Sequence, residues 1–362
     1  MEHEGSPSRF TPNRRSLLMS AAAAGAAFFL PGPGRSGLAR EGENLIFLTW
    51  GGDFGAGVRT AFSDPFTAET GATIQDVTPF NFGKFLTAMQ NGNPEGYDLI
   101  WFDDDSEPFR AGEAGFLEEL NYDLIPNAKQ AIDSVTQPYA VSPYVTAYQA
   151  AYRTEDYGDN PPGSWADFWD VEKFPGSRSL GTWVGGVLEA ALLADGVEPD
   201  KLYPLDEERA FSKLDELKPN IRVFHDTQSS EQVQQMLTQG EISMVLTWAT
   251  DFIRMHLAGE PVNVIYNQGF YFSPAVGIAK GTEYLELAHG YMNMLLDADA
   301  QRRFVKAWLT SPSNVEAADA LSDEQRASVV AGNVDKMVAL DPKYYADNLE
   351  RIQELYDAWR VG

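Results

Sequence analysis

Residues 45–50, LIFLTW, form a short apolar run, and apolar residues then recur at four-residue spacing at Val58, Phe62 and Phe66. The run predicts a buried strand and the spacing predicts the helix that follows it, which should end at Gly71. The same order continues with a strand over 72–77, a helix around 85–89 that ends near Gly92, and a strand over 97–102. A strand–helix–strand–helix–strand order predicts a mainly parallel sheet with helices on both faces.

The pattern resumes after the Pro- and Gly-rich stretch at residues 160–163. Strands are predicted over 179–183, 221–224 and 242–248, with helices over 187–193 and 210–217 between the first two. Ser229 and Gln232 have the spacing of a capping box at the start of a helix that runs through Met236 and ends at Gly240. The repetition predicts a second α/β lobe, followed by a C-terminal part that is mostly helical.

Ligands of open parallel sheets bind beyond the carboxyl ends of the strands, so the residues that leave each strand are the first candidates for a site. Distinctive residues stand at the ends of three predicted strands. They are Trp50, Gly51, Gly52 and Asp53 at the first strand, Asp103 to Asp105 at the third, and Trp248 and Asp251 at the last strand of the second lobe. Glycines let backbone N–H groups approach a ligand, and the indoles offer flat cation–π faces. Two alternatives stay open, since a tryptophan at a strand end is often core and an aspartate run is often a solvated loop or helix cap.

The N-terminus has the features of an export signal. Arg14 and Arg15 precede an apolar stretch that runs to Leu30, and small residues follow at 36–39. This composition predicts a cleavable leader over residues 1–39, and the arginine pair indicates the twin-arginine route. We expect the mature chain to lie in the periplasm; a retained membrane anchor is the alternative.

Composition excludes several classes of site. The chain has no cysteine, so disulfides, thiolate metal sites and cysteine nucleophiles are excluded. Its formal net charge is −26, and the predicted leader carries +2, so the mature chain carries −28. Such acidity argues against nucleic acid and anionic lipid as partners and permits a cationic ligand. An acidic surface that serves solubility alone would have the same composition.

Several motifs occur in order along residues 43–362. They are Thr49 to Gly52 after the first strand, Gly96 to Leu99 into the third, Ser164 to Trp169 ahead of Lys173 to Gly176, Met244 to Trp248, Ala275 to Thr282, and Ser311 to Asn314. With these motifs the chain resembles the periplasmic solute-binding proteins of ABC importers, and the spermidine/putrescine-binding type above all.

The resemblance implies a two-lobed α/β fold of the type II-like class, with a small molecule held between lobes that close about a hinge and an ABC permease in the inner membrane as partner. It implies no catalysis, no cofactor and no metal site, and we expect a monomer. Lobe 1 is predicted over 43–145 and 273–320, and lobe 2 over 146–272 and 321–362. The crossings near 144–147 and 270–275 should form the hinge.

In the polyamine-binding type, aromatic side chains from both lobes flank the methylene chain, and carboxylates hold the ammonium ends. The resemblance places Trp50 and Trp248 at two of these aromatic positions and Phe272 near another. Trp183 is a further candidate for ligand binding. The acids expected after the first strand of lobe 2 are missing from residues 182–187, and Ser273-Pro274 stands where another is expected. Acids at the strand exits can replace them, namely Asp53, Asp103, Asp105 and Asp251. These observations favour a short, polyamine-like amine over spermidine.

Other functions remain as alternatives. The same fold can bind an amino acid, a betaine or an opine, or serve as a sensor. A secreted glycosidase that uses paired carboxylates, Asp103 and Asp105 among them, is the enzyme alternative. The four histidines lack ligand spacing, and Tyr344-Tyr345 lies too near the C-terminus for the paired tyrosines of ferric-ion binding proteins, which favours ordinary helix packing there.

Overall fold

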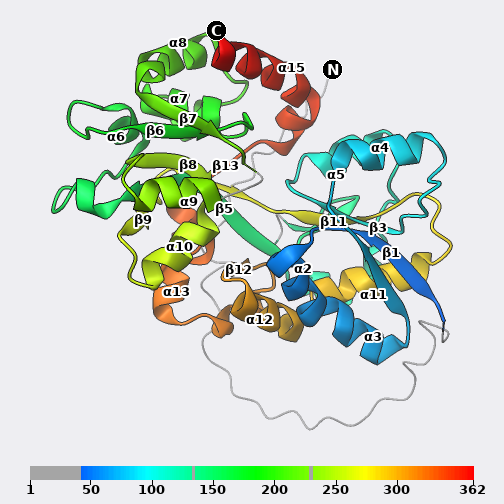
Figure 1. Ribbon diagram of the computed structural model, residues 1–362. Coiled ribbons are helices and arrows are strands. Elements are labelled where there is room, and N and C mark those ends of the chain that lie inside the picture. Colours follow the sequence, from blue (N-terminus) through cyan, green and yellow to red (C-terminus); the bar gives the residue numbers. More distant parts are fainter. Residues whose placement is uncertain (1–41, 133–134, 228–230) are drawn as a thin grey trace, which may run out of the picture.

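The computed structural model describes residues 42–132, 135–227 and 231–362, and the predicted leader lies outside these ranges, as does Ser229 of the predicted capping box. Figure 1 shows two lobes, each built around a β-sheet and covered by helices, with strands that pass between them in the middle of the molecule. The fold is that of a two-lobed periplasmic binding protein.

Lobe 1 contains a five-stranded sheet in the order β2-β1-β3-β11-β4. Strand β1 pairs in parallel with β2 and β3, whereas β11 runs antiparallel to β3 and β4, so the sheet is parallel over the three strands predicted first. The lobe comprises β1 (Asn44–Leu48), β2 (Thr73–Val77), β3 (Leu99–Phe102), β4 (Ala140–Val141), β11 (Ala275–Ile278), α2 (Gly52–Val58), α3 (Asp64–Thr70), α4 (Phe82–Gln90), α5 (Glu107–Glu113), α11 (Leu285–Leu295) and α12 (Ala298–Ala307).

The helix predicted from Val58, Phe62 and Phe66 is interrupted by a π-helical turn over Arg59–Ser63, between α2 and α3. Pro65 has no N–H and therefore cannot donate to the carbonyl of Ala61 four residues earlier. Arg303 of α12 donates to that oxygen instead, at 3.2 Å from Nε and 3.1 Å from Nη2. The apolar side chains still face the core, and a distant arginine satisfies the carbonyl that the proline leaves without an N–H.

Lobe 2 is built on a larger sheet in the order β13-β10-β5-β8-β6-β7, with β9 and β12 paired to β5. Strands β6, β7 and β8 are parallel to one another, and β5 is antiparallel to β8. The lobe comprises β5 (Tyr144–Arg153), β6 (Arg178–Gly181), β7 (Ile221–His225), β8 (Met244–Trp248), β9 (Val262–Val264), β10 (Phe270–Phe272), β12 (Ser311–Pro312), β13 (Val338–Ala339), α6 (Trp165–Trp169), α7 (Val187–Ala194), α8 (Glu207–Leu217), α9 (Glu231–Thr238), α10 (Ala249–Leu257), α13 (Asp323–Ala327), α14 (Val330–Asn333) and α15 (Pro342–Val361).

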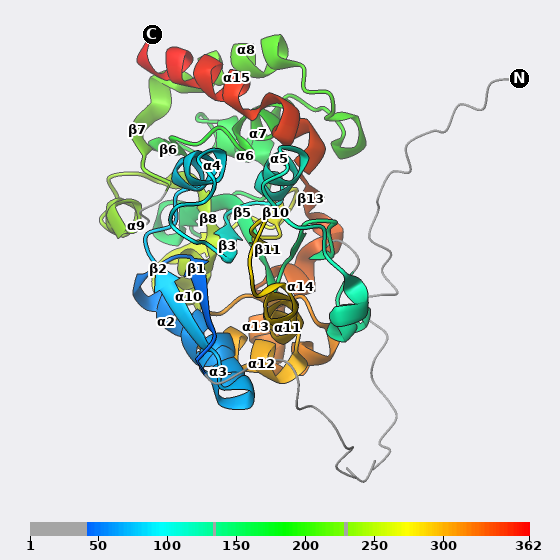
Figure 2. The same cartoon turned by 90° about the vertical axis from the view of Figure 1, so that its right-hand side faces the viewer.

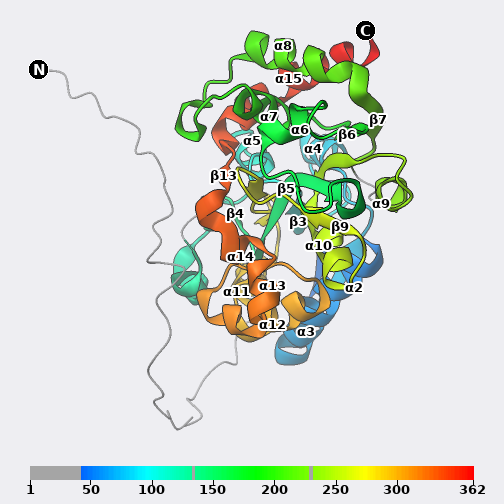
Figure 3. The ribbon, with the colours of Figure 1, turned by 90° about the vertical axis from the view of Figure 1, so that its left-hand side faces the viewer.

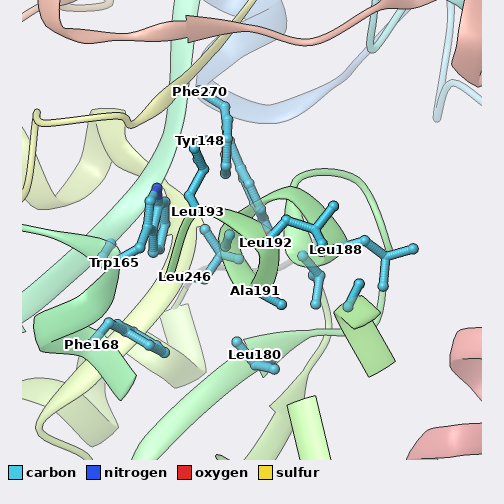
Figure 4. Close-up of a cluster of buried hydrophobic side chains, with 14 of the residues drawn as sticks. Tyr148, Trp165, Phe168, Leu180, Leu188, Ala191, Leu192, Leu193, Leu246 and Phe270 are labelled. Carbon is cyan, nitrogen blue, oxygen red and sulfur yellow. The ribbon is translucent and has the colours of Figure 1, made fainter. Parts of the chain in front are cut away.

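Each face of the lobe 2 sheet has its own core. Helices α6, α7, α8 and α15 pack on one face, where Tyr148, Leu180 and Leu246 project from the strands (Figure 4). Helices α9, α10 and α14 cover the other face, over Ala151 and Val245. The strand predicted over 179–183 ends at Gly181, so Trp183 lies in the turn that follows. The C-terminal part, predicted as mostly helical, also supplies the short strands β9 to β13.

Two strand connections link the lobes at one place, and the chain crosses a third time between α12 of lobe 1 and β12 of lobe 2. Strand β4 belongs to the lobe 1 sheet and is followed by β5 of lobe 2, while β10 of lobe 2 is followed by β11 of lobe 1. The hydroxyl of Ser142 contacts both the Tyr144 carbonyl, at 2.6 Å, and the Pro274 carbonyl. The two connections are therefore tied to each other. The predicted hinge lies here, and its motion stays a prediction.

The C-terminal segment returns to lobe 2 and also touches lobe 1. Figure 3 shows α12 and α13 at the base of the molecule and α15 at the top. Helix α15 buries Tyr345, Ile352 and Tyr356 against lobe 2. Beside α5 of lobe 1 (Figure 2), it forms an ion pair between Glu350 and Arg110.

Candidate functional site

Trp50 and Asp103, predicted from two separate strand exits, are in direct contact. The Trp50 Nε1–H donates to Asp103 Oδ1 at 2.7 Å. They meet because β1 and β3 are parallel neighbours, with Leu48 opposite Ile100, so both strands end at the same edge. The other side of the indole packs on Phe80 at a ring-centroid distance of 5.4 Å. Lobe 1 thus presents an aromatic ring fixed beside a carboxylate.

The three consecutive aspartates, Asp103 to Asp105, differ in burial and in hydrogen bonding. Asp104 is buried and its Oδ1 accepts from the Ser106 N–H, the Ser106 hydroxyl and the Glu107 N–H, at 2.7–3.0 Å, which is the helix-cap role considered above. Asp103 and Asp105 are half-buried on either side of it. Glu107, which the sequence did not single out, turns back so that its Oε2 accepts from the Asp103 N–H at 3.1 Å.

Burial, assisted by the charges of neighbouring carboxylates, raises the pKa values of three carboxyl groups at this strand end. Burial, opposed by the Trp50 hydrogen bond and assisted by the charge of Asp104, raises the pKa of Asp103 to about 7. Burial and the charge of Asp104 raise the pKa of Asp105 to about 8, and burial with the charges of Asp104 and Asp103 raises the pKa of Glu107 well above its usual range. We call Asp103, Asp105 and Glu107 the acid cluster; it gains from any cation that approaches it.

The acid cluster lies near lobe 2. Burial raises the pKa of Tyr271, on β10, to about 12, with a further contribution from the charge of Asp105. Burial and then the charge of Asp103 likewise raise the pKa of Tyr144, the first residue of β5. Both tyrosines belong to strands of the lobe 2 sheet. The acid cluster therefore belongs to the region where the two lobes meet.

The glycines and Asp53 occupy the turn into α2. Gly51 caps that helix, with its carbonyl accepting from the Gly55 N–H at 3.1 Å. Gly52 has φ +63°, a conformation that glycine adopts without strain. The side chain of Asp53 is exposed on the first turn of α2. Its place in ligand binding stays a prediction.

Lobe 2 contributes four aromatic rings that contact one another. Trp183 and Trp248 stack at 5.8 Å between ring centroids with 14° between their planes, and Phe272 lies 5.4 Å from each. Tyr148 of β5, which the sequence did not single out, packs edge-on at 5.6 Å from Trp183 and 5.0 Å from Trp248. These four residues form what we call the aromatic cluster.

The two tryptophans of the aromatic cluster are half-buried, whereas Phe272 and Tyr148 are buried. The cluster sits where β6 and β8 end, since Trp248 closes β8 and Trp183 follows β6 by two residues. The Trp183 indole packs closely against the backbone of Gly185. A Cβ at that position would lie 2.2 Å from the ring, so a larger residue would displace the indole. The tryptophans therefore combine a packed side with an accessible one, which suits a wall for an apolar chain.

Asp251 is held by its own lobe. It accepts from Gln234 Nε2 of α9 at 3.2 Å and pairs with Arg254 Nη1 at 3.6 Å.

Across the described ranges, no group of three or more histidine, aspartate or glutamate side chains has an arrangement that suits a metal ion. Among the same residues, no helix is both long and apolar enough to cross a membrane.

Comparisons with known proteins identify the family. The chain is 25% identical over 326 residues to the gamma-aminobutyric acid-binding protein of Pseudomonas aeruginosa, covering 88% of this chain and 91% of that one. It is 26% identical over 273 residues to the spermidine/putrescine-binding periplasmic protein 1 of Haemophilus influenzae, covering 72% of this chain and 74% of that one. These relatives are solute-binding proteins and not enzymes.

A solved structure of an ABC transporter substrate-binding protein from Bradyrhizobium japonicum superposes with a TM-score of 0.80 at 32% identity, covering 88% of this chain and 99% of that one. The family model of the bacterial extracellular solute-binding protein matches residues 61–330. The chain belongs to the bacterial extracellular solute-binding proteins, the components of ABC importers that bind a small solute and deliver it to a membrane permease.

Proposed function

We propose that this protein captures a small primary amine in the periplasm. The observation that carries the proposal is the acid cluster beside Trp50. Three carboxyl groups with raised pKa values stand at one strand edge, and one of them is fixed by the indole N–H. An ammonium group placed there favours the ionised form of these carboxyl groups and displaces a proton from them, and the Trp50 ring face adds a cation–π contact.

The chemistry that two relatives share supports this ligand class. One is named for gamma-aminobutyric acid and the other for spermidine and putrescine, and all three molecules carry a primary ammonium on a short methylene chain. The accessible sides of Trp183 and Trp248 suit the methylene groups. The turn over 182–187 has no acid and Asp251 already pairs with Arg254, which supports a ligand with one strongly held ammonium over a long polyamine held at both ends.

Isothermal titration calorimetry of the purified mature chain tests the proposal. Butylamine, putrescine and spermidine serve as ligands, with an uncharged sugar of similar size beside them. We expect the short amines to bind and spermidine to bind more weakly than putrescine. Asp103→Asn should weaken binding at least tenfold, while Asp123→Asn, an exposed aspartate on a distant turn, serves as the matched control. Binding of the sugar with no binding of any amine would refute the proposal.

The proposal also covers the route of export and the oligomeric state of the mature chain. The arginine pair in the predicted leader supports export by the twin-arginine route, and we also propose that the mature chain is a monomer. Gel filtration of the mature chain with light scattering measures the second, and a dimer would count against it.

A further inference from the structure

Two buried polar atoms at the carboxyl end of the lobe 2 sheet have no hydrogen-bond partner among the described residues. They are the Tyr148 hydroxyl oxygen and His225 Nε2. Tyr148 is 0% exposed and His225 is 2% exposed. Buried polar groups in folded proteins almost always have partners, because leaving one without a hydrogen bond costs about 1–3 kcal/mol. Two such atoms close together point to a ligand.

Both atoms lie beside Gly181, which has no side chain. A Cβ at that position would lie 2.3 Å from Cγ2 of Thr227, 2.7 Å from the Tyr148 hydroxyl and 3.7 Å from His225 Nε2, so the Thr227 methyl lies next to the pair. Gly181 and His225 are paired as the last residues of the neighbouring strands β6 and β7, and Tyr148 reaches the same point from β5. The Tyr148 ring is part of the aromatic cluster, so this polar pair adjoins the surfaces of Trp183 and Trp248.

The hydrogen bonds of Ser179 fix which nitrogen of His225 carries the proton. The Ser179 hydroxyl lies 3.0 Å from the Val223 carbonyl, which can only accept, so the serine proton points there. The same oxygen lies 2.8 Å from His225 Nδ1 and must therefore accept from an Nδ1–H. Burial lowers the pKa of His225 to about 4, against opposing effects of Asp226 and the Leu180 carbonyl. The neutral ring thus presents a lone pair at Nε2.

We propose that Tyr148 and His225 form a neutral recognition pair for the end of the ligand remote from its ammonium, and that this end is a hydroxyl or a primary carboxamide. His225 Nε2 accepts the ligand O–H or N–H, and the Tyr148 hydroxyl donates to the ligand oxygen. The inference rests on the proposed amine-binding function. A carboxylate has no proton to give to Nε2, and a second ammonium would meet two neutral acceptors instead of a counter-charge.

A series of four-carbon amines on the wild-type mature chain tests the pair by calorimetry. Butylamine reports on the ammonium end alone, and aminobutanol, aminobutanamide, gamma-aminobutyrate and putrescine add four different groups at the other end. We expect aminobutanol and aminobutanamide to bind about tenfold more tightly than butylamine, as two neutral hydrogen bonds allow. Gamma-aminobutyrate and putrescine should bind more weakly than either.

Two variants remove one member of the pair each. Tyr148→Phe keeps the ring, and His225→Asn keeps a donor for Ser179 while it removes Nε2. Each should lose most of the gain of aminobutanol over butylamine, so that the two ligands bind with nearly equal affinity. Because the Tyr148 hydroxyl has no hydrogen-bond partner among the described residues, Tyr148→Phe should melt no earlier than wild type. Tyr291→Phe is the control, since that buried hydroxyl of lobe 1 bonds Ser63 at 2.8 Å, and it should change no ligand affinity.

The outcomes separate the two proposals. If butylamine and every other amine fail to bind, the proposed amine function is wrong, and the proposed recognition pair is then wrong as well. If butylamine binds, but a polar end brings no gain or both variants keep the gain, the recognition pair is wrong and the amine function stands. Tightest binding of gamma-aminobutyrate or putrescine would overturn the neutral ligand class.

Discussion

The acid cluster predicts that solute binding and fold stability respond to pH in opposite directions. Asp103 and Asp105 have pKa values of about 7 and about 8, above the value of about 3.9 of an unfolded aspartate. Between about pH 4 and pH 8 the folded chain therefore binds more protons than the unfolded chain, so the free energy of unfolding falls as pH rises. An ammonium ligand, in contrast, needs ionised carboxylates, so its affinity should rise over the same range.

The magnitudes follow from these shifts. The pKa rises by about three units for Asp103 and about four for Asp105, which corresponds to about 4–5 kcal/mol for a fully desolvated group. Since both side chains are half-buried, we reduce this to about 1–2 kcal/mol each. The ligand-free protein should melt several degrees higher at about pH 5 than at about pH 8. Where one carboxyl group must lose a proton for binding, affinity should fall by up to tenfold for each pH unit below about 7.

Calorimetric titration with butylamine in buffers of different ionisation enthalpy counts the protons released on binding. We expect about one proton at about pH 7 in the wild type and fewer in Asp103→Asn, because the ligand pulls the pKa of the aspartate down. Butylamine itself stays charged throughout. An affinity that is constant from about pH 6 to pH 8, with no proton released, would refute the reasoning, as would a ligand-free protein that is most stable at alkaline pH.

Three further results are expected. Replacement of both Arg14 and Arg15 by lysine should leave an uncut precursor in the cytoplasm, which cell fractionation detects; normal periplasmic accumulation would favour the general secretory route. Trp248→Ala should weaken amine binding by about 1–3 kcal/mol in calorimetry, whereas a large loss of melting temperature with unchanged binding would identify the residue as core alone. The Arg110–Glu350 ion pair is exposed, so Glu350→Gln should cost no more than about 1 kcal/mol of stability and shift small-angle scattering of the ligand-free protein toward a larger radius; an unchanged radius would show that the pair does not hold the lobes together.

Local patterns in the sequence were enough to predict the architecture. The periodicity of residues 45–102 predicts β1, β2 and β3 and the helices between them, and the parallel order brings Trp50 to Asp103. In the π-helical turn after α2, the Ala61 carbonyl accepts from Arg303, more than two hundred residues away, and no local pattern predicts that contact. Element boundaries differ by a few residues, and this is enough to move Trp183 from a strand to a turn.

The missed site residues differ in how far sequence could have found them. Glu107 lies four residues after Asp103, at the start of a helix that follows a strand exit, so its position carried a usable signal. Tyr148 lies in the middle of an almost entirely buried ten-residue strand and has the pattern of a core residue. Its significance depends on a hydroxyl that has no hydrogen-bond partner in the described part of the chain, and this depends on the neighbouring strands and on the absence of a side chain at Gly181.

The Ser142 hydroxyl, which touches the carbonyls of Tyr144 and Pro274, gives the interlobe connections a mechanical property. Two independent tethers would let the lobes slide past each other as well as rotate. Because one hydroxyl lies against both connections, we predict that a twist of one strand is passed to the other, which favours rotation of the lobes about a shared axis over sliding. On this prediction, opening and closing of the lobes follow the same path in opposite directions.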